Sequence, residues 1–184
     1  DTPVYINEMV NKHKPSSAIS TARVNFLAHL LDNGTEENLG FEDGKFPPEK
    51  TIYLTLLRNT GIHRRMGREY LLGEPRVESF MPLWNVCEAF LDSTKEKPRK
   101  LGELIKILRS RPFKLKQGVI DLWLPTFLII KKNDYSLYND TGIYIHTITR
   151  EVLDIMQKSP AGFSVKAFNV EGVRFEFPIE FRLQ

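Results

Sequence analysis

Residues 101–130, LGELIKILRSRPFKLKQGVIDLWLPTFLII, decide the fold of this chain. Four apolar residues at i, i+3, i+4 and i+7 predict an amphipathic helix over residues 101–109: Leu101, Leu104, Ile105 and Leu108. Lys106 and Arg109 lie on the outward side of this helix, and Arg111-Pro112 ends it. After Gly118 we expect an apolar helix to about Lys132, kinked or restarted at Pro125.

Turn and strand signals follow this helical pair. Residues 135–138 and 143–145 are rich in Tyr and Ile and flank Asn139-Asp-Thr-Gly142, which predicts a β-hairpin. Thr147 or Thr149 is expected to cap a helix that ends at Lys158. Apolar residues then alternate in two segments, 163–167 and 173–177. Helices followed by a small terminal hairpin are typical of a winged helix.

The first half is predicted to contain helices over 3–12, 16–32, 48–61 and 79–91 and a strand over 69–75. Ser16 or Ser17 should cap the second of these helices, and Ser79 the last. The basic stretch 95–100 is interpreted as a linker. We therefore predict a mainly helical α+β protein of two tandem winged-helix-like units, residues 1–93 and 94–184, with short hairpins.

Positive charge is concentrated between Lys95 and Lys116, where nine Lys or Arg accompany two Glu. That segment carries a net charge of +7, whereas the whole chain carries only +3. Seven of its cations are predicted to contact the phosphates of double-stranded DNA: Lys97, Arg99, Lys100, Arg109, Arg111, Lys114 and Lys116. The alternatives are a solvated linker and a face that docks onto an acidic protein surface.

A second basic cluster, Arg64, Arg65 and Arg68, is also a candidate for phosphate contact. The alternative is a solvated turn or pairing with Glu69 and Glu74.

Aromatic residues are not interleaved with the cations of 95–116 except for Phe113, which argues against stacking on single strands. The tyrosines at positions 135, 138 and 144 are assigned to hairpin packing, with a base platform as the alternative.

Catalytic motifs are absent from the sequence. It contains no Gly-x4-Gly-Lys-Ser/Thr, Gly-x-Gly-x-x-Gly or Gly-x-Ser-x-Gly pattern, and its four histidines have no i,i+3 or i,i+4 partner histidine. We therefore expect no catalytic residue, no metal site and no cofactor in this segment. A metal-dependent nuclease is the third alternative, and its nearest match is Glu42-Asp-Gly-Lys45.

A single cysteine, Cys87, excludes a disulfide framework and lies among apolar residues. We interpret it as a buried structural thiol rather than a nucleophile, and we expect a reducing, cytoplasmic location. The N-terminus, Asp1-Thr-Pro3, does not resemble a signal peptide. The longest apolar run, 119–130, is shorter than the roughly 20 residues of a membrane span, so no membrane partner is expected. We expect the chain to be a segment of a longer protein.

Seven short motifs are distributed along the chain: TPVYINEMVN (2–11), AR (22–23), FPPEKTIY (46–53), TGIH (60–63), RPFKLKQGVI (111–120), LYNDTG (137–142) and SPAGF (159–163). Together they resemble a segment of very large bacterial P-loop ATPases of anti-phage defence islands, including BREX-like systems. The resemblance covers most of the chain in the same order, and it departs from the family at Asp121 and Pro125.

This resemblance implies a region beyond the nucleotide-binding module of an ATPase that acts on DNA or on partner assembly. The ATPase motifs themselves are not present here. The resulting hypothesis is a non-catalytic DNA-binding or docking module, with other domains or subunits of a larger assembly as partners. A purely structural, protein-interaction domain is the alternative.

Overall fold

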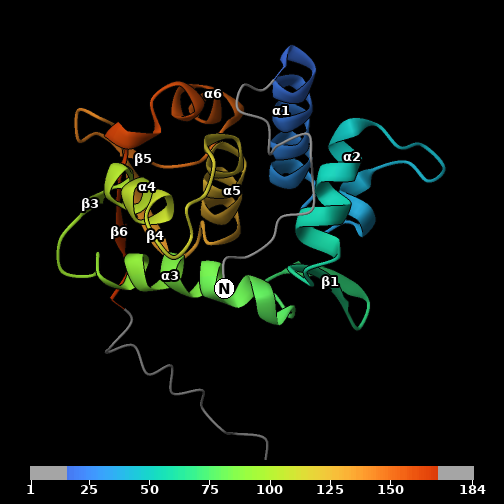
Figure 1. Cartoon of the computed structure of the whole chain (residues 1–184), viewed down its shortest axis with the longest axis horizontal. Helices are drawn as coiled ribbons and strands as arrows, with labels where there is room; N and C mark the ends of the chain where they lie inside the picture. Colours follow the sequence, from blue (N-terminus) through green and yellow to red (C-terminus); the bar gives the residue numbers. More distant parts are fainter. Residues whose placement is uncertain (1–15, 170–184) are drawn as a thin grey trace, which may run out of the picture.

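The structure, a computed structural model, describes residues 16–169 (Figure 1). Its helices are α1 (Ser17–Asp32), α2 (Pro48–Tyr53), α3 (Met81–Asp92), α4 (Leu101–Arg109), α5 (Gln117–Ile130) and α6 (Arg150–Lys158). Its strands are β1 (His63–Met66), β2 (Glu69–Leu72), β3 (Arg99–Lys100), β4 (Tyr135–Tyr138), β5 (Tyr144–Ile145) and β6 (Ser164–Ala167). Short turns η1 (Glu37–Gly40), η2 (Leu54–Arg58), η3 (Glu78–Phe80) and η4 (Pro160–Gly162) complete it. The predicted mainly helical α+β class is confirmed.

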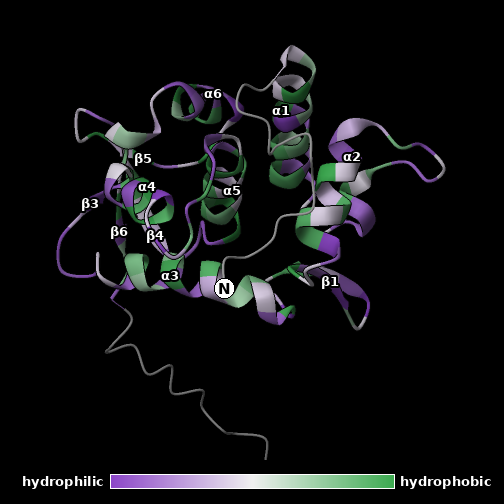
Figure 2. Cartoon of the chain, viewed as in Figure 1, coloured by the Kyte–Doolittle hydropathy of each residue, from purple (hydrophilic) through white to green (hydrophobic). Residues whose placement is uncertain are grey.

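The central helix is α5, of whose 14 residues 11 are buried. It runs unbroken through Pro125, where the sequence had suggested a kink or a restart. Trp123 and Phe127 pack against the rings of Phe80 and Trp84 at centroid distances of 5.2–6.2 Å. Figure 2 shows the predominantly hydrophobic colouring of α5. None of the helices within residues 16–169 is long and apolar enough to cross a membrane.

The core is continuous across the predicted boundary at 93/94. Buried residues from Ala22 in α1 to Val165 in β6 belong to one cluster. Thr94 is fully buried, and its hydroxyl donates to Leu91 O (2.7 Å) and accepts from Ala167 N (2.8 Å). The described parts of the two predicted domains therefore pack as one hydrophobic unit.

Two antiparallel sheets lie at the edges of this helical core. One is the β1–β2 hairpin, and the other has the strand order β3-β6-β4-β5. In β4 and β6 buried and half-buried residues alternate, so one face of the larger sheet packs on the core. Strand β6 is central, because β3 pairs on one side of it and β4 on the other.

Local signals account for the elements that were predicted correctly. Ser16 Oγ accepts from Ile19 N at the start of α1, and Thr149 Oγ1 accepts from Val152 N at the start of α6, both at 3.3 Å. In the β4–β5 turn, Asn139 Oδ1 accepts from the backbone N–H groups of residues 141 and 143.

Other predictions were wrong in detail. No side chain caps α3, which begins after the η3 turn rather than at Ser79. The helix predicted over 48–61 is α-helical only to Tyr53 and continues as the π turn η2. Residues 63–66, for which a solvated turn was one alternative, form β1, and residues 99–100 of the predicted linker form β3.

Winged-helix units are not confirmed. The helix over 3–12 and the strand over 173–177 lie outside the described residues, so the terminal hairpin stays a prediction. Within residues 16–169, β6 pairs with β3 and β4, which both precede it in the chain, and not with a following strand of a terminal hairpin.

Candidate nucleic-acid interface

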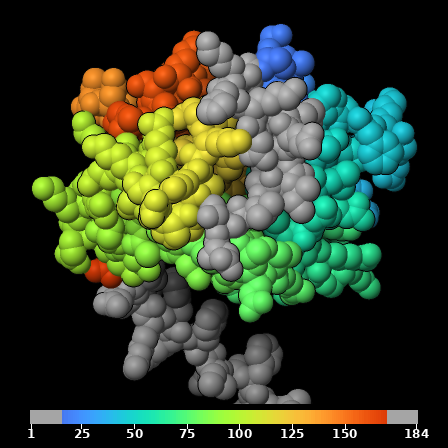
Figure 3. Space-filling model, viewed as in Figure 1, coloured from blue at the N-terminus to red at the C-terminus, as the bar shows by residue number. Residues whose placement is uncertain are grey.

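Helix α4 carries the centre of the basic segment. Leu101, Leu104, Ile105 and Leu108 are buried and Ile107 is half-buried, which turns Lys106 and Arg109 toward solvent. Figure 3 shows the atoms of β3, α4 and the following loop, coloured lime to yellow, on one face of the molecule. The fold therefore gathers the stretch 95–116 on one side.

The loop from 110 to 116 is fixed from inside by an aromatic anchor. Phe113 is buried, with 7 % of its surface exposed. Leu115 N donates to Leu108 O at 2.9 Å, and Lys114 N donates to Ser110 O at 2.8 Å. The charged residues on either side of Phe113, namely Arg111, Lys114 and Lys116, are exposed as a result.

Two cations of the segment are held by neighbouring groups. Arg99 donates to Ser93 Oγ (2.6 Å), pairs with Glu103 (3.3 Å) and lies 4.6 Å from the ring centroid of Phe90. The hydrogen bond from Arg99 holds the pKa of Glu103 below its ordinary value. Lys95 pairs with Asp92 at 3.3 Å. Arg99, a predicted phosphate contact, therefore has structural partners already.

Five other cations of the segment are exposed, and their side chains make neither an ion pair nor a hydrogen bond within residues 16–169: Lys97, Lys100, Lys106, Arg111 and Lys114. We call these five residues the α4 basic surface. Four were predicted from sequence as phosphate contacts. Lys106 was placed outward on the helix but was not counted among the contacts, although the apolar periodicity of α4 could have identified it.

Arg109 and Gln117 begin a chain of polar contacts that leads from the end of α4 to α1. Arg109 donates to Gln117 Oε1, and Gln117 Nε2 donates to Asp121 Oδ1. Asp121 also pairs with Arg23 of α1 at 3.4 Å, and both of these side chains are mostly buried. The partner of Arg109 is a neutral amide, so its charge is oriented without being neutralised.

The second predicted cluster is divided by the fold. Arg64 donates to Gly61 O (2.7 Å) and Glu74 O (2.9 Å), so its guanidinium braces the β1–β2 hairpin. Arg65 donates to Gly67 O within the turn and remains exposed, as does Arg68. Figure 1 places β1 on the opposite side of the molecule from α4, so the two clusters do not form one surface.

Cys87 is a buried structural thiol, as predicted. It has no exposed surface, and Trp123 Nε1 donates to its sulfur at 3.4 Å. Burial raises the pKa of its thiol to about 12, which leaves the thiol protonated at neutral pH.

The remaining candidates for chemistry are held in structural contacts. In the 42–45 loop, Lys45 pairs with Glu42, and the buried Lys50 donates to Glu42 O at 2.6 Å. No group of three His, Cys, Asp or Glu within residues 16–169 is arranged to hold a metal ion. His63 is buried with its Nδ1 3.0 Å from Tyr53 OH, and burial lowers its pKa.

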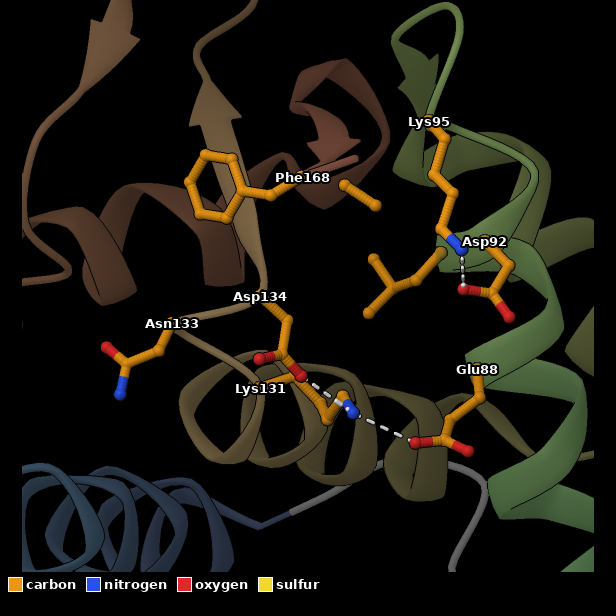
Figure 4. A pocket seen from close by; sticks show the side chains of 9 residues that line it. Glu88, Asp92, Lys95, Lys131, Asn133, Asp134 and Phe168 are labelled. Atoms are coloured by element: carbon orange, nitrogen blue, oxygen red, sulfur yellow. Dashed lines mark hydrogen bonds and ion pairs between the residues drawn. The ribbon is translucent and has the colours of Figure 1, made fainter. Parts of the chain in front are cut away.

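A pocket of about 270 Å³ lies between α3, the end of α5 and the end of β6 (Figure 4). Lys131 lies between Glu88 (2.9 Å) and Asp134 (2.7 Å), and Lys95 lies on Asp92. Each lysine that lines the pocket is therefore matched by a carboxylate, and the pocket presents no excess positive charge to a phosphate.

Comparison of the chain with protein-family models, curated proteins and solved structures gives no match. The fold and the α4 basic surface therefore carry the functional argument.

Proposed function

We propose that this chain is a non-catalytic binding module whose α4 basic surface contacts the phosphate backbone of double-stranded DNA. The observation that supports this most strongly is the state of the cations after folding. Five exposed Lys or Arg side chains around α4 have no ion-pair or hydrogen-bond partner among the described residues, whereas Arg64 and Arg99 are held internally. Unpaired cations on one face attract a polyanion and release its counterions.

The resemblance to large defence ATPases favours the same proposal, because such a parent protein would need regions that hold DNA or partner subunits. Docking onto an acidic protein surface is the rival function, and a metal-dependent nuclease is the third. The five residues of the α4 basic surface include no carboxylate, histidine or cysteine that could hold a catalytic metal ion, so the proposed role is binding.

The test is a salt titration of the whole chain with a fluorescent DNA duplex, read by anisotropy. If each of the five cations meets a phosphate, the slope of log affinity against log salt is about −4.5, and affinity falls about 500-fold between about 50 and 200 mM salt. In the triple variant Lys106→Gln, Arg111→Gln, Lys114→Gln, the slope should shrink to about −1.8.

The matched control removes three cations that lie outside both basic clusters, Lys45→Gln, Arg76→Gln and Lys132→Gln, and should keep the original slope. Absence of duplex binding at about 50 mM salt, where non-specific contacts are strong, would eliminate the DNA proposal and favour protein docking. Incubation of the chain with plasmid and Mg²⁺ or Mn²⁺ tests the nuclease alternative. Plasmid that stays intact would eliminate that alternative.

A further inference from the structure

The four-stranded sheet has an outer face that the core does not cover. On its inner face, Tyr135, Leu137, Val165 and Ala167 are at most 7 % exposed. The alternate residues of β4 and β6, whose side chains point to the other face, are half-buried: Ser136, Tyr138, Ser164 and Lys166. Tyr144 of β5 is 52 % exposed. The outer face therefore presents side chains to solvent.

The register of the strands brings a lysine and two tyrosines into one row across that face. Lys100 of β3 is paired with Ser164 of β6, Ser164 with Tyr138 of β4, and Tyr138 with Tyr144 of β5. Paired residues of neighbouring antiparallel strands share a face, and strands are about 4.8 Å apart, so the row spans about 15 Å. Lys166, two residues after Ser164, lies on the same face in the adjacent row.

The rings of this face form a contiguous group. The ring centroids of Tyr138 and Tyr144 are 5.9 Å apart, and those of Tyr144 and His146 are 6.0 Å apart. The hydroxyl of Tyr135, on the inner face, donates to Leu128 O at 2.7 Å. The hydroxyls of Tyr138 and Tyr144 make no hydrogen bond to other described residues. Core packing and its hydrogen bond explain the position of Tyr135, whereas much of the Tyr144 ring is exposed to water and has no such structural explanation.

The strands of this face carry a net positive charge. Lys100 and Lys166 form no ion pair within residues 16–169. The four strands contain no acidic residue, and the β4–β5 turn contributes one, Asp140, at its tip. Exposed rings beside unpaired lysines complement a ligand that carries both flat apolar rings and negative charge.

We propose that this outer face, with Tyr138, Tyr144 and His146 as stacking rings and Lys100 and Lys166 as phosphate contacts, binds single-stranded nucleic acid. Unpaired bases expose their flat faces and stack on aromatic side chains, and open sheets with exposed rings are one established platform for this. In a duplex the bases stack on one another, so the rings discriminate between the two forms. Sequence spacing argued against such a site, because the lysines and tyrosines that meet here come from strands distant in the chain.

This site is separate from the α4 basic surface apart from Lys100, which belongs to both. The two sites are therefore tested with different variants and different ligands, and either can fail without the other.

The test is fluorescence anisotropy of labelled oligo-dT, about 15 nucleotides long, and of a matched duplex, with the whole chain at about 50 mM salt. We expect Tyr144→Ala to weaken oligo-dT binding about 5- to 150-fold, the range given by base–aromatic stacking, and to leave duplex binding unchanged. Tyr144→Phe keeps the ring and should bind like the parent chain. Phe46→Ala removes an aromatic side chain that is 71 % exposed elsewhere and is the matched control.

A second variant does not depend on the hairpin. Lys166→Gln should reduce the salt slope for oligo-dT by about 0.7, the value of one phosphate contact with a single strand. The proposal is overturned if oligo-dT does not bind, if Tyr144→Ala binds it as tightly as the parent chain, or if Tyr144→Ala weakens single strand and duplex equally. Circular dichroism confirms that each variant is folded.

Discussion

The hydroxyl of Thr94 connects the end of α3 to the end of β6, and replacing it with an isosteric methyl group tests how strongly the two halves are joined. In Thr94→Val, Ala167 N loses its acceptor at 2.8 Å in a buried position. An unsatisfied buried N–H costs about 1–3 kcal/mol, and the lost bond to Leu91 O costs about 1 kcal/mol more. That carbonyl keeps its bond from Thr94 N at 2.9 Å.

The extra methyl group returns about 0.8 kcal/mol of apolar burial. We therefore expect Thr94→Val to lower the free energy of unfolding by about 2 kcal/mol. Thr94→Ser keeps both hydrogen bonds and loses one methyl group, so it should cost about 1 kcal/mol.

Urea unfolding followed by circular dichroism and by tryptophan fluorescence measures both variants. Trp84 and Trp123 lie in the shared core, so the two probes should give one coincident transition with an unchanged m-value. A Thr94→Val protein as stable as the parent chain, or less affected than Thr94→Ser, would refute the bridging role. Two separate transitions would refute the cooperative unit.

Three further predictions concern buried groups. Burial lowers the pKa of His63, so its contribution to stability is present above the unfolded pKa of about 6.5 and is lost as pH falls from there toward the folded pKa. The urea midpoint should therefore decrease when the pH is lowered from 7.5 to 5, and His63→Gln should make that decrease smaller. Cys87, with a pKa of about 12 and no exposed surface, should react with a thiol reagent only as fast as the protein unfolds, and rapid labelling of the native protein would contradict its burial. Lys50→Met removes the bond to Glu42 O and the contact with the Phe46 ring at 4.7 Å, so limited proteolysis should cut the 42–46 loop faster, whereas exposed Lys132→Met should not change the rate.

Sequence patterns predicted the elements whose causes are local. The apolar spacing of α4, the caps Ser16 and Thr149 and the turn at Asn139 each act within a few residues. Strand β1 was missed because His63-Arg-Arg-Met66 lacks apolar alternation, and its outer positions face solvent. Strand β3 was missed because it has two residues and its partner β6 lies more than sixty residues away.

The same distinction applies to the candidate sites. Charge clustering identified the α4 basic surface, since that segment is continuous in the sequence. The internal partners of Arg64 and Arg99 could not be predicted, because they depend on the closure of the hairpin and on the path of the chain after α3. The row that joins Lys100 to Tyr144 could be predicted only from the order of the strands in the sheet, and the periodicity of the sequence does not contain that order.

Helix α5 is almost completely buried, and this limits how the chain can be truncated. From the first half of the chain, α1 and Trp84 of α3 pack against it, and from the second half α6 and Tyr135 of β4 do so; we call these two groups its walls. A truncation that keeps only one wall would expose Trp123 and its neighbours and would promote self-association through them. In anisotropy measurements on such half-chains, non-specific association through the exposed hydrophobic surface would be mistaken for nucleic-acid binding. Binding should therefore be measured on chains that retain both walls.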